Sequence, residues 1–199
     1  MLKIDNIEKK FKTKTVLNDV SLHVKNGELI HISGSNGSGK STLFKIITGL
    51  LLPESGTVTT DKTDVIGALI ENPGFLEFED AMTNLKFLGD LNQRFDKNRV
   101  TDLMIQFDLN PKSRQAVAKY SVGMRQKLGI IQSVMENQNV ILLDEPTRGL
   151  DAESVTQFIK LLQRLVSENK LVVIASHDHI DGIVYDKMMS LKDGKLLNA

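Results

Sequence analysis

A glycine-rich segment between a strand-like run and a helix-like run constrains the fold of this chain most. The segment GSNGSGKST, from Gly34 to Thr42, satisfies all eight positions of the pattern G-x-x-x-x-G-K-[ST]. Glycines let the backbone pass close to phosphate oxygens, so that successive N–H groups form an anion-binding nest. A following helix adds the positive end of its dipole. A chance Gly/Ser-rich loop is the alternative, but the flanking strand and helix favour a phosphate-binding loop (P-loop).

The residues of the P-loop predict distinct roles. Lys40 is expected to reach the β- and γ-phosphates of a nucleotide as a catalytic residue, and the Ser41 hydroxyl to bind Mg²⁺. Thr42 is expected to lie near the α-phosphate. The other members of the loop are expected to bind phosphate oxygens: Gly34, Ser35, Asn36, Gly37, Ser38 and Gly39.

A second candidate element is the run VILLDEP, from Val140 to Pro146. Its apolar residues predict a buried strand, and ligands bind at the carboxyl ends of strands in parallel α/β sheets. Asp144 is expected to hold Mg²⁺, and Glu145 to polarise the attacking water as a general base. Alone, the run could equally end in a solvated acidic turn. A P-loop on the same predicted sheet favours the catalytic interpretation.

The histidines divide into one candidate and three others. His177 follows the apolar run LVVIAS, at a predicted strand end on the P-loop side of the sheet. A neutral imidazole there could hydrogen-bond the γ-phosphate and the attacking water, although position alone leaves a structural role equally open. His31, in the strand before the P-loop, and His23 are interpreted as packing residues. His179 has no evident role.

Apolar periodicity predicts a single α/β domain over residues 1–199, with a helical subdomain inserted at approximately 75–137. Near-alternating apolar residues at 2–11 and 15–24 predict an N-terminal antiparallel pair with one exposed face. A helix is expected at 40–50, with Leu43, Ile46, Ile47 and Leu50 on one face.

Buried strands and helices alternate in the last third of the chain. Strands are expected at 140–143 and 171–175, with a helix between them at 151–168. Continuous apolar runs between amphipathic helices favour a parallel sheet that is covered on both faces. Asp193-Gly194 predicts a terminal hairpin.

Composition narrows the class of partners. Lys+Arg and Asp+Glu both total 25, so the formal net charge is zero and bulk nucleic-acid binding gains no support. No cysteine is present, which excludes disulfides and thiolate metal sites. The N-terminus has no apolar core of a signal peptide, and no apolar run approaches the ~20 residues of a transmembrane helix. If the protein acts at a membrane, another chain is expected to span it.

Further motifs occur in an order that resembles the ATP-binding-cassette (ABC) ATPases. The run YSVGMRQ, at 120–126, resembles the signature loop of that family, usually LSGGQ. Residues 149–151 resemble its D-loop, and 175–178 resemble its switch-histidine segment. Phe11 lies where the family places an aromatic that stacks on adenine, and Val16 beside the base. The resemblance covers essentially the whole chain.

The resemblance implies a P-loop NTPase fold of the RecA-like type, with ATP and Mg²⁺ as ligands. It also implies that two cassettes sandwich two nucleotides head to tail. In that arrangement Ser121 and Gly123 cap the γ-phosphate bound by a second copy, and Asp151 lies across the same interface. From the residues alone, Ser121 could be only the N-cap of a helix.

Two departures from the family pattern resemble its bacitracin-resistance and lantibiotic-immunity branch. The signature-like run has Val122 where the family has its second small residue. Glu71, in IGALIENPGF, stands where most members have a Gln that contacts Mg²⁺. The resemblance therefore implies the ATPase subunit of a peptide exporter. Its partners would be permease chains and a second cassette, and it would lie on the cytoplasmic face of the membrane. A haem or small-molecule exporter, a DNA-associated ABC ATPase and a non-hydrolysing regulatory module are the alternatives.

Overall fold

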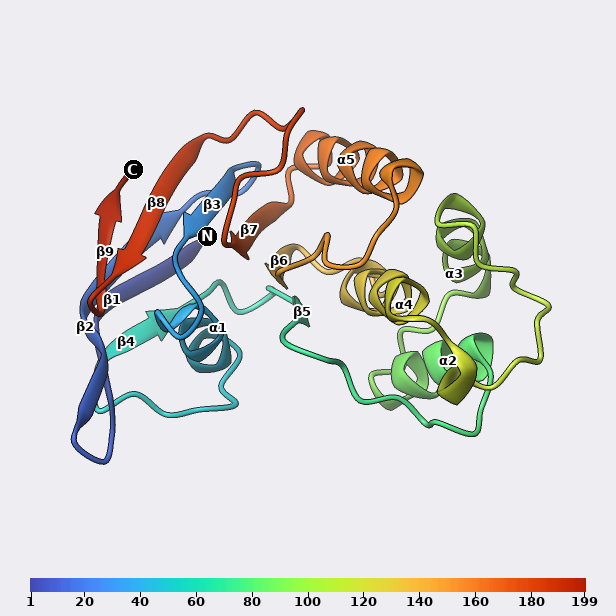
Figure 1. Cartoon of the computed structure of the whole chain (residues 1–199), viewed down its shortest axis with the longest axis horizontal. Helices are drawn as coiled ribbons and strands as arrows, with labels where there is room; N and C mark the ends of the chain where they lie inside the picture. Colours follow the sequence, from blue (N-terminus) through green and yellow to red (C-terminus); the bar gives the residue numbers. More distant parts are fainter.

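The computed structural model describes residues 1–199 and contains two β-sheets (Figure 1). The smaller sheet is antiparallel, with the strand order β2-β1-β4, and comprises β1 (Leu2–Phe11), β2 (Lys14–Val24) and β4 (Ser55–Thr59). Residues Leu2, Ile4 and Ile7 are fully buried, whereas residues between them reach the surface. Alternation with one wet face therefore predicted the β1–β2 pair correctly, whereas the addition of β4 to that pair was not predicted.

The larger sheet has six strands in the order β5-β6-β7-β3-β8-β9. All its neighbours are parallel except the terminal hairpin of β8 and β9. Because parallel neighbours end on the same edge, the residues that follow β3, β5, β6 and β7 are brought together. The strands are β3 (Leu29–Ser33), β5 (Ile66–Leu69), β6 (Val140–Asp144), β7 (Leu171–Ser176), β8 (Lys187–Lys192) and β9 (Lys195–Asn198).

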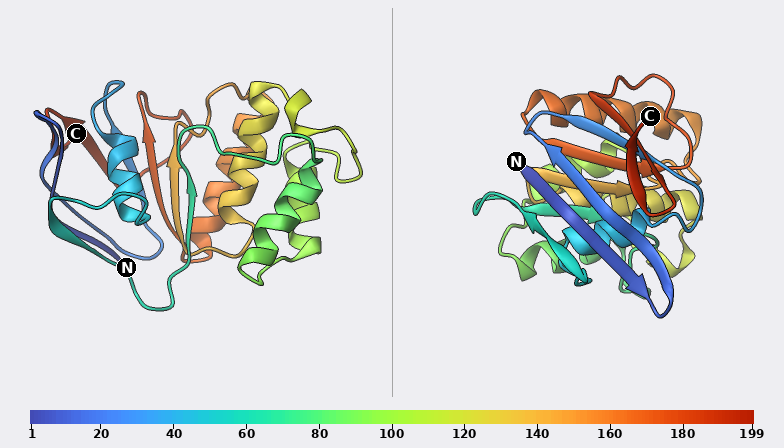
Figure 2. Two further views of the ribbon diagram at one scale, coloured as in Figure 1. Left: turned by 90° about the horizontal axis from the view of Figure 1, so that it is seen from below. Right: turned by 90° about the vertical axis from the view of Figure 1, so that its left-hand side faces the viewer.

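Helices cover both faces of the larger sheet. Helix α1 (Lys40–Ile47) lies between the two sheets, and α5 (Ala152–Ser167) covers the opposite face of the larger one (Figure 2). Helices α2 (Ala81–Leu91) and α3 (Lys97–Gln106) pack against α4 (Val122–Val134) at one side of the molecule (Figure 2). A short 3₁₀ turn (Val117–Lys119) precedes α4.

The core has two clusters, one on each face of the larger sheet. One joins the antiparallel sheet, α1 and the inner residues of β3, including Ile30 and Ile32. The other joins α5 and the three-helix group to the opposite face, including Leu29. The sheet edge that carries the P-loop is thus supported on both sides by packed side chains.

Two sequence interpretations were wrong. Helix α1 ends at Ile47 rather than at residue 50, because Gly49 adopts a positive φ of 74°, and Leu50 is 74% exposed. His23 does not pack in the interior but lies exposed, with Nε2 2.8 Å from Asp5 Oδ1. His31 is buried, as predicted. None of the helices combines the length and the apolar character that crossing a membrane requires.

Candidate nucleotide-binding site

The P-loop runs from the end of β3 to the start of α1, and its last glycine has a backbone that few other residues adopt. Gly39 is the N-cap of α1 with φ of 111°. A Cβ atom at this position would lie 3.0 Å from a Leu17 methyl carbon and 3.1 Å from one of Val16. Glycine is therefore required both for the dihedral angle and for space. The residues at this turn and at the start of α1 line a cavity.

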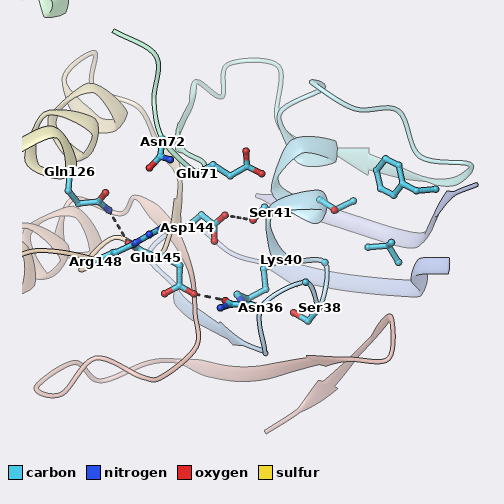
Figure 3. Close-up of a pocket in the computed structure, with 15 residues that line it drawn as sticks. Asn36, Ser38, Lys40, Ser41, Glu71, Asn72, Gln126, Asp144, Glu145 and Arg148 are labelled. Atoms are coloured by element: carbon cyan, nitrogen blue, oxygen red, sulfur yellow. Dashed lines mark hydrogen bonds and ion pairs between the residues drawn. The ribbon is translucent and has the colours of Figure 1, made fainter. Parts of the chain in front are cut away.

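That cavity has a volume of about 560 Å³, within the usual range for small-molecule sites, about 300–1,000 Å³ (Figure 3). Its only apolar walls are Phe11 and Val16, and the remainder is polar. It thus combines a surface for a flat ring with a phosphate cradle. Its lining comprises Phe11, Val16, Asn36, Gly37, Ser38, Gly39, Lys40, Ser41, Thr42, Glu71, Asn72, Gln126, Asp144, Glu145 and Arg148.

Lys40 is a nearly buried cation at the base of the cavity. Its Nζ donates to the carbonyl oxygens of Gly34 (2.6 Å) and Ser35 (3.3 Å). The same nitrogen lies 3.8 Å from Glu145 Oε1 (Figure 3). Glu145 Oε1 and Ser38 Oγ are buried without any hydrogen-bond partner. Because buried polar atoms rarely lack partners, these two fit a cavity that receives a polar ligand.

Ser41 and Asp144 meet beside Lys40. Ser41 Oγ donates to Asp144 Oδ2 at 2.5 Å, joining the start of α1 to the end of β6 (Figure 3). Burial raises the pKa of Asp144, although the Ser41 hydrogen bond and the charge of Lys40 act in the opposite direction. A hydroxyl and a carboxylate oxygen are hard ligands of the kind that Mg²⁺ prefers. The residues present therefore fit a magnesium ion at this point.

Two glutamates follow adjacent strands of the sheet. β5 and β6 are paired with Leu69 opposite Leu143, and Glu71 and Glu145 come just after them. Both adopt left-handed backbones, with φ of 56° and 48°. Such conformations are uncommon outside glycine and cluster at functional sites. Both side chains line the cavity.

The first of these glutamates is not free. The Glu71 carboxylate accepts a hydrogen bond from Lys45 Nζ at 2.6 Å. Lys45 lies in α1, and the Glu71 backbone and charge are close enough to influence the pKa of Asp144. Glu71 thus lines the cavity as expected, with a cationic partner that the sequence did not reveal. A role for it in metal binding stays a prediction.

Gln126, Asn72 and Arg148 also line the cavity, and sequence reasoning gave them no role. Gln126 Nε2 donates to the carbonyl oxygen of Glu145 at 2.9 Å, which links α4 to the end of β6. The contact joins residues 19 positions apart, and no local pattern indicates it. In the sequence, Asn72 follows Glu71, Gln126 ends the signature-like run and Arg148 lies shortly after Glu145. This proximity was the only sequence signal that they line the cavity.

His177 lies in a neighbouring cavity of about 320 Å³ rather than among the P-loop residues. Glu145 lines both cavities, which connects the histidine to the P-loop site. The His177 side chain is largely exposed, with Nδ1 3.1 Å from Asp178 Oδ1. An imidazole in this position is accessible to a ligand that approaches from outside the chain.

Ser121, Gly123 and Asp151 lie outside the P-loop cavity. Ser121 Oγ accepts from the Met124 N–H as the N-cap of α4, and Asp151 caps α5 in the same way through Ser154. Gly123 touches the segment before Asp151, since a Cβ atom on it would lie 2.5 Å from the Gly149 carbonyl oxygen. Helix capping is thus one role of Ser121. Nucleotide contacts across a cassette interface stay a prediction for these three residues.

Comparisons with known proteins agree with this geometry. A family model described as ABC transporter matches residues 17–148. An uncharacterised ABC transporter ATP-binding protein of Bacillus subtilis, YdbJ, is 34% identical over 89% of the chain. The lantibiotic transport ATP-binding protein SrtF of Streptococcus pyogenes and the bacitracin transport ATP-binding protein BcrA of Enterococcus faecalis are each 32% identical over 89% of it. The chain spans 80% of SrtF but only 61% of YdbJ and of BcrA.

Solved structures agree on the whole architecture. The dimeric structure of MJ0796, described as a bacterial ABC transporter cassette, superposes with a TM-score of 0.89 at 26% identity. The superposition covers 98% of this chain and 96% of that one. Another structure of MJ0796 is a dimer in a post-hydrolysis state with bound ADP and Pi. The fold is therefore that of P-loop NTPase cassettes, and the chain belongs to the ABC transporter family as one of its ATP-binding cassette ATPases.

Proposed function

We propose that this chain binds and hydrolyses ATP as one subunit of a transporter that exports an antimicrobial or related peptide. The observation that carries the ATPase part is one cavity holding the P-loop, the Ser41–Asp144 pair and an unpartnered Glu145 oxygen. The peptide part rests on relatives and on Glu71, and it is tested separately below.

Nucleotide binding follows from the walls of the cavity. The base would stack on Phe11 and pack against Val16, while the backbone N–H groups of the P-loop bind the phosphates. Lys40 Nζ would exchange its carbonyl contacts for the β- and γ-phosphate oxygens. Ser41 and Asp144 would hold Mg²⁺, which neutralises charge on the phosphates.

Hydrolysis requires a base that faces the terminal phosphate. Glu145 Oε1 lies 3.8 Å from Lys40 Nζ, so water between this oxygen and a γ-phosphate on Lys40 would be within reach of both. Glu145 takes a proton as the water oxygen bonds to phosphorus and the bond to the ADP oxygen breaks, giving ADP and phosphate. His177, which lines the neighbouring cavity that Glu145 shares, would hydrogen-bond that phosphate.

A second cassette would complete the site. The first turn of α4 is at the surface, and Val122 is exposed there beside Gly149 of its own chain. A helix N-terminus attracts phosphate, so Ser121 and Gly123 would bind the γ-phosphate held by another copy. The dimers of MJ0796 support such an assembly. Asp151, which begins α5 beside Gly149, would lie in the same interface.

A separate membrane protein would dock beside the Glu71 loop. Phe78, in the loop between β5 and α2, is almost fully exposed, and Phe87 and Leu91 lie exposed one turn apart on α2. Exposed apolar side chains such as these would contribute to a contact surface for a protein partner. Movement of a docked permease could thus be transmitted through residues 71–78 to the cavity.

The nature of the cargo is inferred from relatives. SrtF and BcrA are described as lantibiotic and bacitracin transport proteins, and both cover 89% of this chain. A haem or small-molecule exporter is the second candidate, because the nucleotide cavity does not determine which molecule is transported. A DNA-associated ABC ATPase is disfavoured because the longest helix has 16 residues, too short for a long coiled-coil arm.

Peptide export is tested in cells that lack this gene. Restoring the wild-type chain with its permease should raise resistance to a bacitracin-type or lantibiotic peptide, and Lys40→Ala should not. Haem and small-molecule toxicity, measured in the same strains, distinguish the second candidate. Unchanged peptide sensitivity together with active ATP hydrolysis would discard the peptide assignment while leaving the ATPase assignment intact.

A further inference from the structure

His31 is a buried titratable residue that the proposed hydrolysis does not use. It lies in β3, and its side chain is 1% exposed. Its ring stacks at a tilt of 34° against Tyr185, with 5.0 Å between the ring centroids. A histidine in such a place needs explanation, because an apolar residue would fill the same space without a polar atom to satisfy.

One ring nitrogen of His31 begins a chain of hydrogen bonds. His31 Nε2 lies 2.8 Å from Ser176 Oγ, and Ser176 Oγ lies 2.6 Å from the carbonyl oxygen of Asp178. A carbonyl oxygen only accepts, so the single Ser176 hydroxyl hydrogen points to Asp178. Ser176 Oγ must then accept from His31, and the His31 proton is on Nε2.

The other ring nitrogen favours a neutral ring. His31 Nδ1 is buried and has no hydrogen-bond partner, so a proton there would be unsatisfied. Burial lowers the pKa of His31, and the neighbouring His179 and Lys40 act in the same direction, whereas the Asp178 backbone acts to raise it. Position and charge therefore favour the neutral imidazole with its proton on Nε2.

The segment held by this chain of hydrogen bonds contains His177. Ser176 and Asp178 flank it directly, and the Ile180 N–H donates to the Tyr185 hydroxyl at 3.3 Å. His31 and Tyr185 thus tie both ends of residues 176–180 to the sheet interior. The His177 side chain itself is largely exposed and lines the cavity next to Glu145.

We propose that His31 is a positioning residue, which through Ser176 fixes the backbone turn that presents His177 to the terminal phosphate. The inference rests on the proposed ATPase function. The strand before the P-loop then has two roles, because its end supports the phosphate cradle and its side supports the His177 turn. His31 touches neither nucleotide nor water.

Enzyme kinetics test this role. His31→Leu removes the donor, and we expect kcat for ATP hydrolysis to fall roughly tenfold, or about 1.4 kcal/mol, with KM for ATP nearly unchanged. His31→Gln keeps an N–H donor and should restore most of the rate. Ser176→Ala should resemble His31→Leu, and the two losses should not add in the double variant. His23→Leu, an exposed histidine on β2, is the matched control and should have no effect.

A spectroscopic measurement keeps the test independent of activity and folding of the variants. In ¹⁵N-labelled wild-type protein, the His31 imidazole should show the Nε2–H tautomer and stay neutral at pH 6.5, near the ordinary histidine pKa of about 6.5. An Nδ1–H tautomer or a charged ring would overturn the inference. So would wild-type kcat in folded His31→Leu, or a His177→Ala variant that hydrolyses ATP normally. Absence of ATP hydrolysis by the wild-type chain would instead refute the proposed function. The spectrum would still show whether His31 Nε2 donates to Ser176 Oγ.

Discussion

The Lys45 ammonium group donates a hydrogen bond at 2.6 Å to the carboxylate of Glu71, a residue that lines the nucleotide cavity. Lys45 lies in the helix that begins at the P-loop, and Glu71 lies in the loop that leads to the exposed Phe78. The pair therefore links the phosphate side of the site to the proposed permease surface. It also supplies a counter-charge for a carboxylate close to bound phosphates.

Neutralising Lys45 and neutralising Glu71 should affect different properties, namely ATP affinity in the first case and coupling to the permease in the second. Lys45→Met leaves the Glu71 charge unpaired near the phosphates, so ATP affinity should fall by up to roughly fivefold, or about 1 kcal/mol, the usual limit for an exposed pair. Glu71→Gln should leave ATP affinity nearly unchanged but reduce stimulation of hydrolysis by the permease. The double variant should regain ATP affinity. Titration with a fluorescent ATP analogue measures the affinities, and equal loss of affinity in Glu71→Gln would contradict this account.

Replacing Asp144 by Asn should stabilise the nucleotide-free protein while abolishing its response to Mg²⁺. Burial holds the pKa of Asp144 above that of the unfolded chain, so the folded state binds a proton more tightly. Ionising the buried Asp144 carboxyl therefore lowers the free energy of unfolding. This loss is absent below the pKa of the unfolded chain and grows as pH rises through the pKa of the folded protein. Asn keeps an acceptor for Ser41 without that charge.

Thermal unfolding measures both effects of this substitution. At pH 7.5 the gain should be roughly 0.5–2 kcal/mol, the usual size for a single stabilising substitution. The gain should shrink as pH falls. Mg²⁺-dependent stabilisation by ATP should be lost in Asp144→Asn and retained in the wild type. A lower melting temperature for the variant at pH 7.5 would show that Asp144 is not destabilising in the free protein.

Gly39→Ala should damage the P-loop itself. The substitution forces a Cβ atom into a backbone with φ of 111° and against Leu17 and Val16. We expect a destabilisation of roughly 1–3 kcal/mol and loss of ATP binding. Gly74→Ala is the control, because a Cβ atom there meets nothing within 4 Å. Calorimetry with ATP checks both variants, and normal binding by Gly39→Ala would show that the loop tolerates a side chain.

Gly123→Ala should separate binding from assembly. A Cβ atom on Gly123 would lie 2.5 Å from the Gly149 carbonyl oxygen, so the turn before Asp151 must shift. Both segments lie outside the P-loop cavity, so a single chain should bind ATP with unchanged affinity. ATP-dependent dimerisation, measured by light scattering, should weaken at least tenfold if both segments form the interface. Wild-type dimerisation would argue against that interface.

Local patterns in the sequence were sufficient to predict individual strands and the P-loop. Alternation located β1 and β2, continuous apolar runs located β6 and β7, and the glycine spacing located the P-loop. Contacts between distant segments were beyond reach. The Lys45–Glu71 pair spans 26 residues and the His31–Ser176 pair spans 145. Within a strand, a histidine packed as an apolar residue would be and a histidine with a hydrogen-bond partner have the same sequence pattern. The partner of His31 could therefore be identified only from the fold.

The exposed Leu50 shows a different limit. Its spacing from Leu43, Ile46 and Ile47 fits a helix, yet the positive φ of Gly49 ends α1 before that position is reached. Helical periodicity describes where a side chain would point if the helix continued. A single glycine decides whether it does.

Phosphate release from ATP by Glu145→Gln tests the central claim most directly. Gln keeps the shape of the side chain but cannot accept a proton from water, so this variant should bind ATP, dimerise with it and release phosphate at least about a hundredfold more slowly than the wild type. Lys40→Ala, measured beside it, should fail to bind ATP at all. Turnover by Glu145→Gln at the wild-type rate would contradict the assignment of Glu145 as the base.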